Sequence, residues 1–410
     1  MSAATKEISG VGIFRTRENG LLIPRGNRAT LLDGHLPEAF STHLMGEIER
    51  TGLNGPIANQ FLRHPELEDR FMNGRVKIDS DPLLETEHMV VPGFIHKYEA
   101  EGLWELLLKC DSYCRHCFRD QMGTSGRIAD ASVDAAIDYV EKTPKLRQVI
   151  ASGGDIFTLS QKEFEYPMNA LARLLKQGDL DSVRLASRLP FHNPDRIKEF
   201  HYEAVRNLNN PYLMFHINHY EELQHPKTRA VYKKFLEAGG RLKGQMVFLR
   251  GVNADLKNGY GLSDMEWVVE TVVDENGQPH LVVVEDLSID EDKTVETLTR
   301  TFTEMANAGV DPYYVYQNDP VPWAWFYTVP LPQAYRIWQR VRNPDDIVGT
   351  ANTARFVLDA PHGYGKVAIP EGGSWTDVDV RDGYVDLHGK RHPLEWPFPI
   401  ELAGVKVHYK

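Results

Sequence analysis

The first residues whose type and spacing could do chemistry are three cysteines, the only cysteines in the sequence. They are Cys110, Cys114 and Cys117, separated by three and then two residues. An odd, clustered set makes a poor disulfide framework, so the spacing predicts a metal or cluster site. Three thiolates can hold three irons of a 4Fe–4S cluster, and the fourth iron then stays open to a small molecule. The alternative left open is a zinc site of three cysteines and a histidine such as His116.

Polar residues and glycines recur where later apolar runs end or begin. They are Ser152, Gly153, Gly154, Asp155, Ser187, Arg188 and Gln245. Adjacent glycines let the backbone approach a ligand closely, and the aspartate after them can bind an ammonium group. Placed one unit after the cysteines, the segment from Ser152 to Asp155 favours a binding site over a simple turn. Ser187, Arg188 and Gln245 are weaker candidates, because an arginine at a strand end often forms only a surface ion pair.

A lysine near the C-terminus lies in a glycine-rich segment, DAPHGYGK, which runs from Asp359 to Lys366. The glycines predict a loop, and a lysine amine presented by such a loop can form a Schiff base with pyridoxal phosphate. Glycine turns that carry a lysine are common, so this segment alone does not predict a pyridoxal phosphate site. The prediction depends on the other motifs.

The elements that must position these residues alternate between two patterns. Short apolar runs, rich in β-branched residues, lie at 103–109, 148–154, 182–187, 212–218, 244–251 and 312–319. Helical patterns lie at 133–142, 162–176, 194–207, 226–239 and 293–308. This alternation predicts parallel strands joined by crossover helices. Six units favour an open or partial barrel, with the site at the carboxyl ends of the strands.

Other segments depart from this pattern. Residues 1 to about 100 are polar, with helical stretches such as 42–50. Residues 266–288 predict a hairpin insertion, because two β-rich arms flank Asn276-Gly277. The aromatic run at 323–327 favours core packing, with a reshaped substrate pocket as the alternative. The tail predicts a small, irregular or β-rich cap. We therefore expect an N-terminal extension at 1–100, a barrel at 101–345 with its insertion at about 257–290, and a lysine segment with a cap at 346–410.

Composition sets the broad class. The 410 residues are 42% hydrophobic and 25% charged, which is typical of a globular protein. The net charge of −12 argues against a nucleic-acid-binding surface. No apolar stretch has the length of a membrane span and no secretion signal is visible, so we expect a cytoplasmic protein.

Taken in order, the motifs CRHCFR, SGGD, PYYVYQND and DAPHGYGK resemble the lysine 2,3-aminomutase family of radical S-adenosylmethionine (SAM) enzymes. Shorter likenesses are DPLLETE at 81–87, VPGFIHKY at 91–98, SRLP at 187–190, HINHYEEL at 216–223 and LRGVNAD at 249–255. The resemblance runs from about residue 55 to 370. It implies an α/β fold, a partial (β/α)6 TIM-like barrel with an N-terminal helical extension and a small C-terminal cap.

The resemblance also implies roles for individual residues. Cys110, Cys114 and Cys117 would hold the 4Fe–4S cluster. SAM would be bound by His116, Ser152, Gly153, Gly154, Asp155, Ser187, Arg188 and Gln245. Lys366 would form the Schiff base with pyridoxal phosphate, whose phosphate and ring would contact Lys97 and Tyr98. Arg119 would pair with the substrate carboxylate, while Asp319 and Asp359 would hold a side-chain ammonium group.

Several positions depart from the family pattern. Glu101 and Gly102 stand where the family usually offers a second basic residue for the cofactor phosphate. The hairpin insertion, the aromatic run and the amino-acid sequence at 349–357 are atypical of the family. The cysteines that bind zinc between subunits in some members are absent. These departures leave the exact substrate open.

The function implied is a pyridoxal-dependent 2,3-aminomutase, an isomerase that moves the α-amino group of L-lysine or a similar basic amino acid to C3. Another pyridoxal-dependent radical SAM reaction, on arginine, another amino acid or protein-bound lysine, is the first alternative. A non-catalytic iron–sulfur or zinc protein is an alternative of another class. The implied partners are a small amino acid, an electron donor such as flavodoxin or ferredoxin, and possible further copies of the chain, with neither nucleic acid nor membrane.

Overall fold

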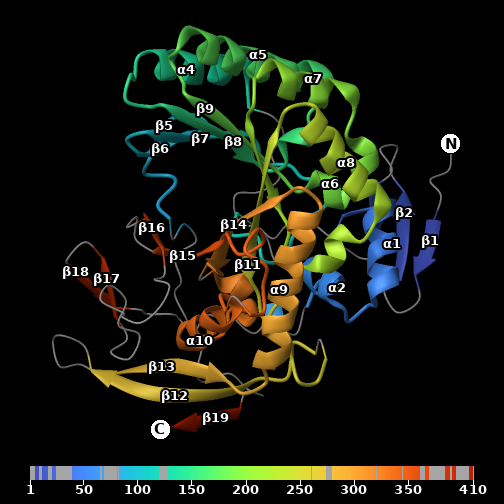
Figure 1. Ribbon diagram of the computed structural model, residues 1–410, viewed down its shortest axis with the longest axis vertical. Coiled ribbons are helices and arrows are strands. Elements are labelled where there is room, and N and C mark those ends of the chain that lie inside the picture. The colour runs from blue at the N-terminus through green and yellow to red at the C-terminus, as the bar shows by residue number, and fades with distance from the viewer. Residues whose placement is uncertain are drawn as a thin grey trace.

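The strands predicted from the apolar runs form the centre of one mixed sheet in the computed structural model (Figure 1). The structure describes residues 5–8, 12–16, 21–24, 39–64, 67–68, 81, 83–119, 128–259, 261–273, 279–319, 321–343, 345–360, 365–368, 384–387, 390–393 and 406–409.

The central sheet has ten strands in the order β16-β15-β14-β11-β10-β9-β8-β7-β6-β5. They are β5 (Met89–Val91), β6 (Phe94–Tyr98), β7 (Glu101–Leu107), β8 (Gln148–Gly153), β9 (Ser182–Ser187), β10 (Tyr212–His216), β11 (Arg241–Phe248), β14 (Asp311–Gln317), β15 (Arg355–Ala360) and β16 (Gly365–Ala368). The strands from β7 to β15 are parallel, and β5, β6 and β16 are antiparallel to their neighbours. The chain is therefore an α/β protein with a mostly parallel sheet.

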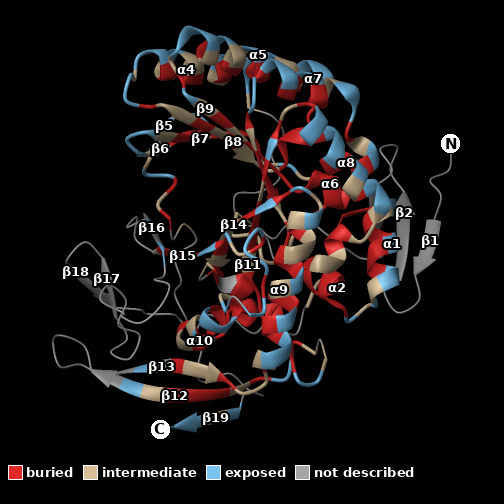
Figure 2. Ribbon diagram, in the orientation of Figure 1, coloured by how far each residue is buried: buried red, intermediate tan, exposed pale blue. Residues whose placement is uncertain are grey.

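Helices lie between these strands, as the alternating pattern predicted. The α-helices are α4 (Asp130–Glu141), α5 (Gln161–Gln177), α6 (Leu189–His192), α7 (Glu199–Asn207), α8 (Pro226–Glu237), α9 (Glu291–Asn307) and α10 (Leu331–Val341). The 3₁₀-helices are η2 (Ile156–Thr158), η3 (Pro194–Arg196), η4 (Tyr220–Leu223) and η5 (Pro322–Tyr327). Figure 2 shows that the helix faces turned towards the sheet are buried and the outer faces are exposed. The amphipathic sequences form helices here because burying their apolar faces against the sheet stabilises them.

Local signals fix where the helices begin and end. Helix α5 begins with a capping box, in which Ser160 and Glu163 each satisfy a backbone N–H of the other. It ends at Gly178, whose φ of 85° is a left-handed conformation that suits glycine. The stretch predicted as one helix at 194–207 is instead two elements, because η3 ends at Arg196 and α7 begins at Glu199.

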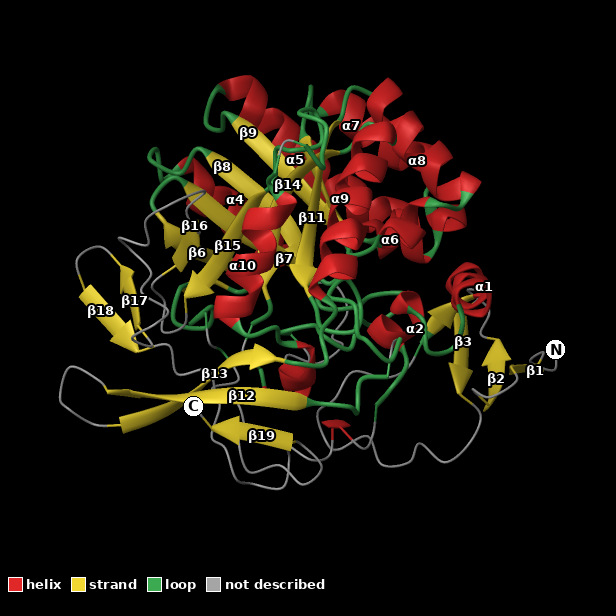
Figure 3. Ribbon diagram, turned by 60° about the horizontal axis from the view of Figure 1, so that its bottom comes forward, coloured by secondary structure: helices red, strands yellow, loops and turns green. Residues whose placement is uncertain are grey.

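The predicted hairpin insertion is present. Strand β12 (Glu266–Val273) pairs antiparallel with β13 (Pro279–Asp286), and β19 (Lys406–Tyr409) adds to β12 in parallel (Figure 3). The turn at Asn276-Gly277 lies outside the described residues. Buried Arg250, beyond β11, anchors the insertion, because its Nε donates to Asp286 at 2.6 Å and its Nη1 to the carbonyl of Leu262 at 2.7 Å.

The N-terminal region differs from the helical extension that was predicted. Besides α1 (Thr42–Thr51) and α2 (Pro56–Phe61), it contains a four-stranded sheet. The strands of that sheet are β1 (Thr5–Ile8), β2 (Gly12–Thr16), β3 (Leu21–Pro24) and β4 (Phe40–Ser41). Strands β5 and β6 also precede residue 100, yet they belong to the central sheet. At the other end, β17 (Tyr384–Leu387) and β18 (Lys390–Pro393) pair within the predicted cap. The domain boundaries and the partial-barrel shape stay predictions.

The aromatic run at 323–327 packs in the core, as its first interpretation predicted. Trp323, Trp325 and Tyr327 are buried within the main hydrophobic cluster. The Trp323 indole donates to the carbonyl of Cys117 at 2.8 Å, and the ring of Tyr327 lies edge-on to His116. The run therefore packs against the cysteine segment and holds it in place. No helix in the described part of the chain is long and apolar enough to cross a membrane.

Candidate active site

One cavity of about 180 Å³ gathers most of the residues that the sequence singled out. The predicted residues on its wall are Cys110, Cys114, His116, Cys117, Arg119, Ser152, Gly153, Gly154, Asp155, Ser187, Arg188 and Asp319. They come from the segment after β7, the ends of β8 and β9, and the segment after β14. These positions are close in space because the carboxyl ends of neighbouring parallel strands share one edge of the sheet.

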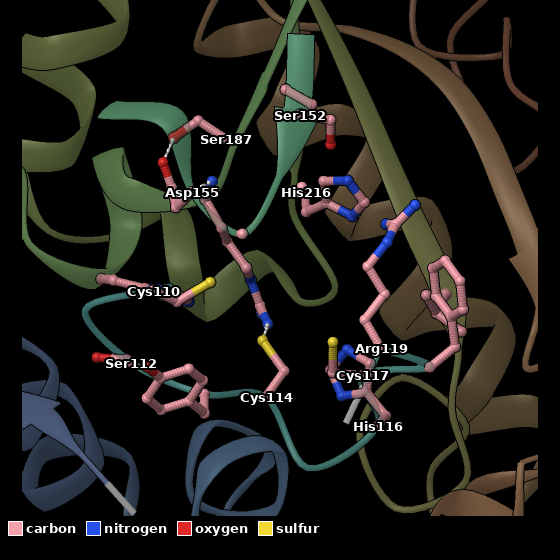
Figure 4. Close-up of a pocket in the computed structure, with 18 of the residues that line it drawn as sticks. Cys110, Ser112, Cys114, His116, Cys117, Arg119, Ser152, Asp155, Ser187 and His216 are labelled. Carbon is pink, nitrogen blue, oxygen red and sulfur yellow. Dashed lines mark hydrogen bonds between the residues drawn. The ribbon is translucent and has the colours of Figure 1, made fainter. Parts of the chain in front are cut away.

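The three cysteine thiols lie at separate points around the cavity wall (Figure 4). Burial raises the pKa of the Cys110 and Cys114 thiols, and bound iron would stabilise their thiolates. Within the described residues, no three His, Cys, Asp or Glu side chains converge as ligands of one metal ion. Thiols spread in this way suit a 4Fe–4S cluster, in which each thiolate holds a different iron.

Two glycines shape the cavity beside the cysteines. A Cβ atom on Gly153 would lie 2.1 Å from the carbonyl oxygen of Leu107, and Gly153 has a φ of 106°. A Cβ atom on Gly154 would lie 2.4 Å from the carbonyl oxygen of Lys109. Side chains cannot occupy these positions, so the end of β8 approaches the segment leading to Cys110 as only glycines allow.

Asp155 joins the ends of β8 and β9. Its carboxylate accepts hydrogen bonds from the Ser187 hydroxyl at 2.7 Å, the Arg188 backbone N–H at 2.8 Å and the Phe157 backbone N–H at 3.2 Å. Burial raises its pKa to about 6, although these hydrogen bonds act in the opposite direction. Asp155 is thus at least a structural residue, and its contact with a cofactor ammonium group stays a prediction.

Arg188 places a buried positive charge beside the cysteines. Its guanidinium donates to Cys114 Sγ at 2.9 Å and to Glu222 Oε1 at 2.7 Å, and it also contacts Gln60. Its Nε has no hydrogen-bond partner among the described residues. Arg188 lies on the cavity wall, and a guanidinium there suits a bound carboxylate.

Gln245 does not line the cavity. Its amide lies 2.6 Å from Nε2 of His216, and His216 is on the wall. The side chain of His216 therefore lies between Gln245 and the cavity, where Gln245 was predicted to bind SAM.

The remaining predicted residues form a second group near Lys366. Strand register pairs Asp359 on β15 with Lys366 on β16, and Lys366 Nζ lies 3.3 Å from Asp359 Oδ2. The backbone N–H of Lys366 donates to the Tyr98 hydroxyl at 3.0 Å, and Lys97 precedes Tyr98 on β6. Lys366 is on a strand rather than the predicted loop. Lys97 and Tyr98 end β6, and because β6 is antiparallel to β7 they lie near the start of β7 rather than at the carboxyl ends of the parallel strands.

The charges in this second group are coupled. Burial alone lowers the pKa of Lys366, but Asp359 offsets it and the pKa is raised. Burial lowers the pKa of half-buried Lys97, and Oδ1 of buried Asp359 has no hydrogen-bond partner among the described residues. An ammonium group, a second lysine and a tyrosine ring at one place fit a phosphorylated aromatic aldehyde such as pyridoxal phosphate.

Asp319 connects the two groups. It lies on the cavity wall, and both Asp359 and Lys366 influence its titration. Burial and, secondarily, the negative charge of Asp359 raise its pKa to about 7. Two carboxylates competing for positive charge in this way suit a cation supplied by a ligand.

Several residues of the site were not predicted from the sequence. His192, His216 and Asn318 line the cavity, and Glu85 and Glu105 bind Arg119 at 2.6 and 2.8 Å. A signal existed for Glu85 and His216, which fall within the motifs DPLLETE and HINHYEEL, and for Glu105, the one acidic residue in the apolar run LWELLLK.

The chain is similar to several curated proteins. It is 29% identical to the L-lysine 2,3-aminomutase of Clostridium subterminale over 335 residues, which are 81% of this chain and 68% of that protein. It is 28% identical to that of Acetoanaerobium sticklandii over 291 residues, 70% of this chain and 59% of that protein. It is 27% identical to that of Bacillus subtilis over 293 residues, 70% of this chain and 52% of that protein. The chain thus spans between half and about two thirds of these relatives. No protein-family model matches it.

The raised pKa of Asp319 predicts that this residue lowers the free energy of unfolding by an amount that depends on pH. Asp319 ionises with its usual pKa of 3.8 in the unfolded chain and near 7 in the folded protein. Between these values the unfolded state binds fewer protons, so Asp319 destabilises the fold increasingly as the pH rises. Asp319→Asn should raise the free energy of unfolding by on the order of 2–4 kcal/mol at pH 8 and hardly change it at about pH 4. Urea unfolding at both pH values measures this, and an equal effect at both would contradict the assignment.

Proposed function

We infer that this chain, which belongs to the lysine 2,3-aminomutase family, is a radical SAM isomerase that moves the α-amino group of an amino acid to C3 with the help of pyridoxal phosphate. The observation that carries this proposal is the shared cavity, where three thiols, the glycine pair and Arg188 come together. The relatives extend beyond the matched region, so the activity is proposed from the site and not transferred as a whole.

We assign the 4Fe–4S cluster to Cys110, Cys114 and Cys117. When reduced, a cluster with SAM at its open iron supplies a carbon radical that can remove a hydrogen atom from an amino acid. The chain holds the thiols in a buried pocket, and Trp323 fixes the backbone at Cys117. This burial excludes water and stray hydrogen donors from the reacting centre.

The SAM site is proposed at the surface formed by the ends of β8 and β9. The glycine pair lets the end of β8 pack against the segment leading to Cys110, and the guanidinium of Arg188, on the cavity wall, would bind the carboxylate of SAM. Asp155 and Ser187 hold this surface in place through their mutual hydrogen bond. His116 and Gln245, through His216, complete the wall.

The pyridoxal phosphate site is proposed around Lys366, whose amine would bind the cofactor covalently. Pyridoxal phosphate, when bound, carries the migrating nitrogen and delocalises the unpaired electron. Lys97 supplies positive charge for the phosphate and Tyr98 a ring surface. Glu101, where the family usually offers a second basic residue, is instead salt-bridged to Arg184 at 3.0 Å.

For the substrate we propose L-lysine or a similar basic amino acid. Asp319 and Asp359 are two neighbouring carboxylates that would bind a side-chain cation, and Arg119 lies on the same cavity. Arginine, another amino acid or protein-bound lysine are the alternatives that a substrate panel distinguishes. We also propose that an electron donor such as flavodoxin or ferredoxin reduces the cluster. The fold proposed for 101–345 is a partial (β/α)6 barrel, and the proposed assembly is a homo-oligomer.

The cluster assignment predicts the effect of removing one thiol. Cys114→Ala should abolish the 4Fe–4S absorbance and spin-resonance signals, along with 5′-deoxyadenosine formation, because each thiolate holds one iron. Ser112→Ala, in the same segment and also on the cavity wall, is the matched control and should keep the cluster. An intact, reducible cluster in Cys114→Ala would overturn the radical SAM assignment.

The lysine assignment predicts where the second cofactor attaches. Borohydride reduction of protein loaded with pyridoxal phosphate should label the peptide that contains Lys366, because only a lysine amine forms the covalent link. Lys366→Ala should lose the label and keep the iron–sulfur cluster, whereas Lys243→Ala, at the far end of β11, should retain both. A label on any other lysine, found by peptide mass spectrometry, would contradict the assignment.

A further inference from the structure

His192 is a buried polar residue on the cavity wall to which the proposed function gives no role. It is 3% exposed and is among the residues that line the cavity. Neither of its ring nitrogens, Nδ1 or Nε2, has a hydrogen-bond partner among the described residues. A buried polar group without a partner costs free energy, so a histidine kept at this position indicates that a ligand supplies the partner.

The neighbours described for the ring are apolar or cationic. The ring lies edge-on to Phe61, with the ring centroids 5.0 Å apart, and its centroid lies 5.8 Å from that of Phe191. Arg188 is the nearby cation, and a guanidinium donates hydrogen bonds but accepts none. Burial and, secondarily, the charge of Arg188 lower the pKa of His192 well below its usual value, so the ring is neutral. A neutral imidazole has one N–H to donate, and among the described surroundings the cavity is the place where an acceptor can bind.

Helix α6, which carries His192, is bonded at both ends to the segment that joins the first two cysteines. Before the helix, the Arg188 guanidinium donates to Cys114 Sγ at 2.9 Å. After the helix, the Asn193 amide donates to Asp111 Oδ2 at 3.1 Å. His192 lies between these two contacts in the chain. It therefore occupies the part of the cavity wall that adjoins this cysteine segment.

A 4Fe–4S cluster bound to the cysteine segment would present the acceptor that the ring lacks. Three thiolates give such a cluster a net negative charge, and hydrogen bonds to its sulfurs are one of the factors that set its reduction potential. An N–H group stabilises the reduced cluster more than the oxidised one, because the reduced cluster carries one more negative charge. A hydrogen bond to sulfur therefore makes the cluster easier to reduce.

We propose that His192 donates a hydrogen bond to a sulfur of the 4Fe–4S cluster and thereby raises the reduction potential of the cluster. This inference rests on the proposed function and assigns a residue that adjusts the electron-accepting step of that function. Arg188 supplies a charged N–H to the same group of sulfurs, and His192 adds a neutral one.

The test measures the reduction potential of the reconstituted cluster without SAM, by anaerobic titration with redox dyes followed by electron spin resonance. His192→Leu removes the N–H and breaks no side-chain hydrogen bond of the described residues. It should shift the reduction equilibrium at least tenfold towards the oxidised cluster, which lowers the one-electron potential by about 59 mV or more. His192→Gln keeps an N–H donor and should lower the potential by much less.

His43→Leu is the matched control. His43 is a half-buried histidine whose ring centroid lies 4.5 Å from that of His225, and it is not among the residues that line the cavity. The same change of residue type at this position should leave the potential unchanged.

A second readout does not depend on the leucine variant. In protein labelled with nitrogen-15 histidine, electron–nuclear double resonance of the reduced parent cluster should show a weak coupling to a histidine nitrogen, as expected across a hydrogen bond. His192→Gln should lack this coupling. SAM affinity, measured by equilibrium dialysis, should be the same in the parent and both His192 variants.

Three results would overturn the inference. The first is an unchanged potential in His192→Leu. The second is SAM binding weakened tenfold with an unchanged potential, which would assign the ring to SAM. The third is a strong nitrogen coupling, which would make His192 a ligand of iron. In each case a cluster that binds SAM and forms 5′-deoxyadenosine still supports the aminomutase proposal. If the parent assembles no 4Fe–4S cluster, the proposed function fails, and this inference fails with it.

Discussion

The buried guanidinium of Arg188 is the interaction on which the rest of the site depends. It reaches the thiol of Cys114 on one side and Glu222, before α8, on the other, while its backbone N–H caps Asp155. Arg188 thereby links the ends of β8 and β9, the segment after β10 and the cysteine segment. Breaking a buried ion pair of this kind costs roughly 3–5 kcal/mol, since a charge is left without its partner. The arginine network therefore stabilises the cavity proposed for the cluster.

The other half of the cavity is organised by an excess of negative charge. Glu85 and Glu105 share Arg119, while Asp359 and Lys366 are register partners across a hairpin. Asp319 is coupled to both pairs, and burial, with a smaller contribution from the charge of Asp359, raises its pKa to about 7. A site built in this way is complementary to a cation. In the proposed function, one half of the cavity would hold the cluster and the other would bind the side-chain cation of the substrate.

Much of the fold was predictable because burial leaves a periodic trace in sequence. The six apolar runs became β7, β8, β9, β10, β11 and β14, and the hairpin followed from its Asn-Gly turn signal. The edge strands were missed because short antiparallel strands carry little periodicity, so Lys366 was expected on a loop. The partners of Arg119 were missed for another reason. Glu105 is one acidic residue within an apolar run, and only the tertiary fold shows which cation it meets.

The central claim is that three thiols leave one iron of a cluster open to SAM. Electron–nuclear double resonance on the reduced, reconstituted protein tests it most directly, with SAM labelled by nitrogen-15 at the amino group and oxygen-17 at the carboxylate. The account predicts that both labels couple to the electron spin of the cluster, because both atoms bind the open iron. Spectra that show no coupling, with the cluster intact and SAM bound, would contradict it.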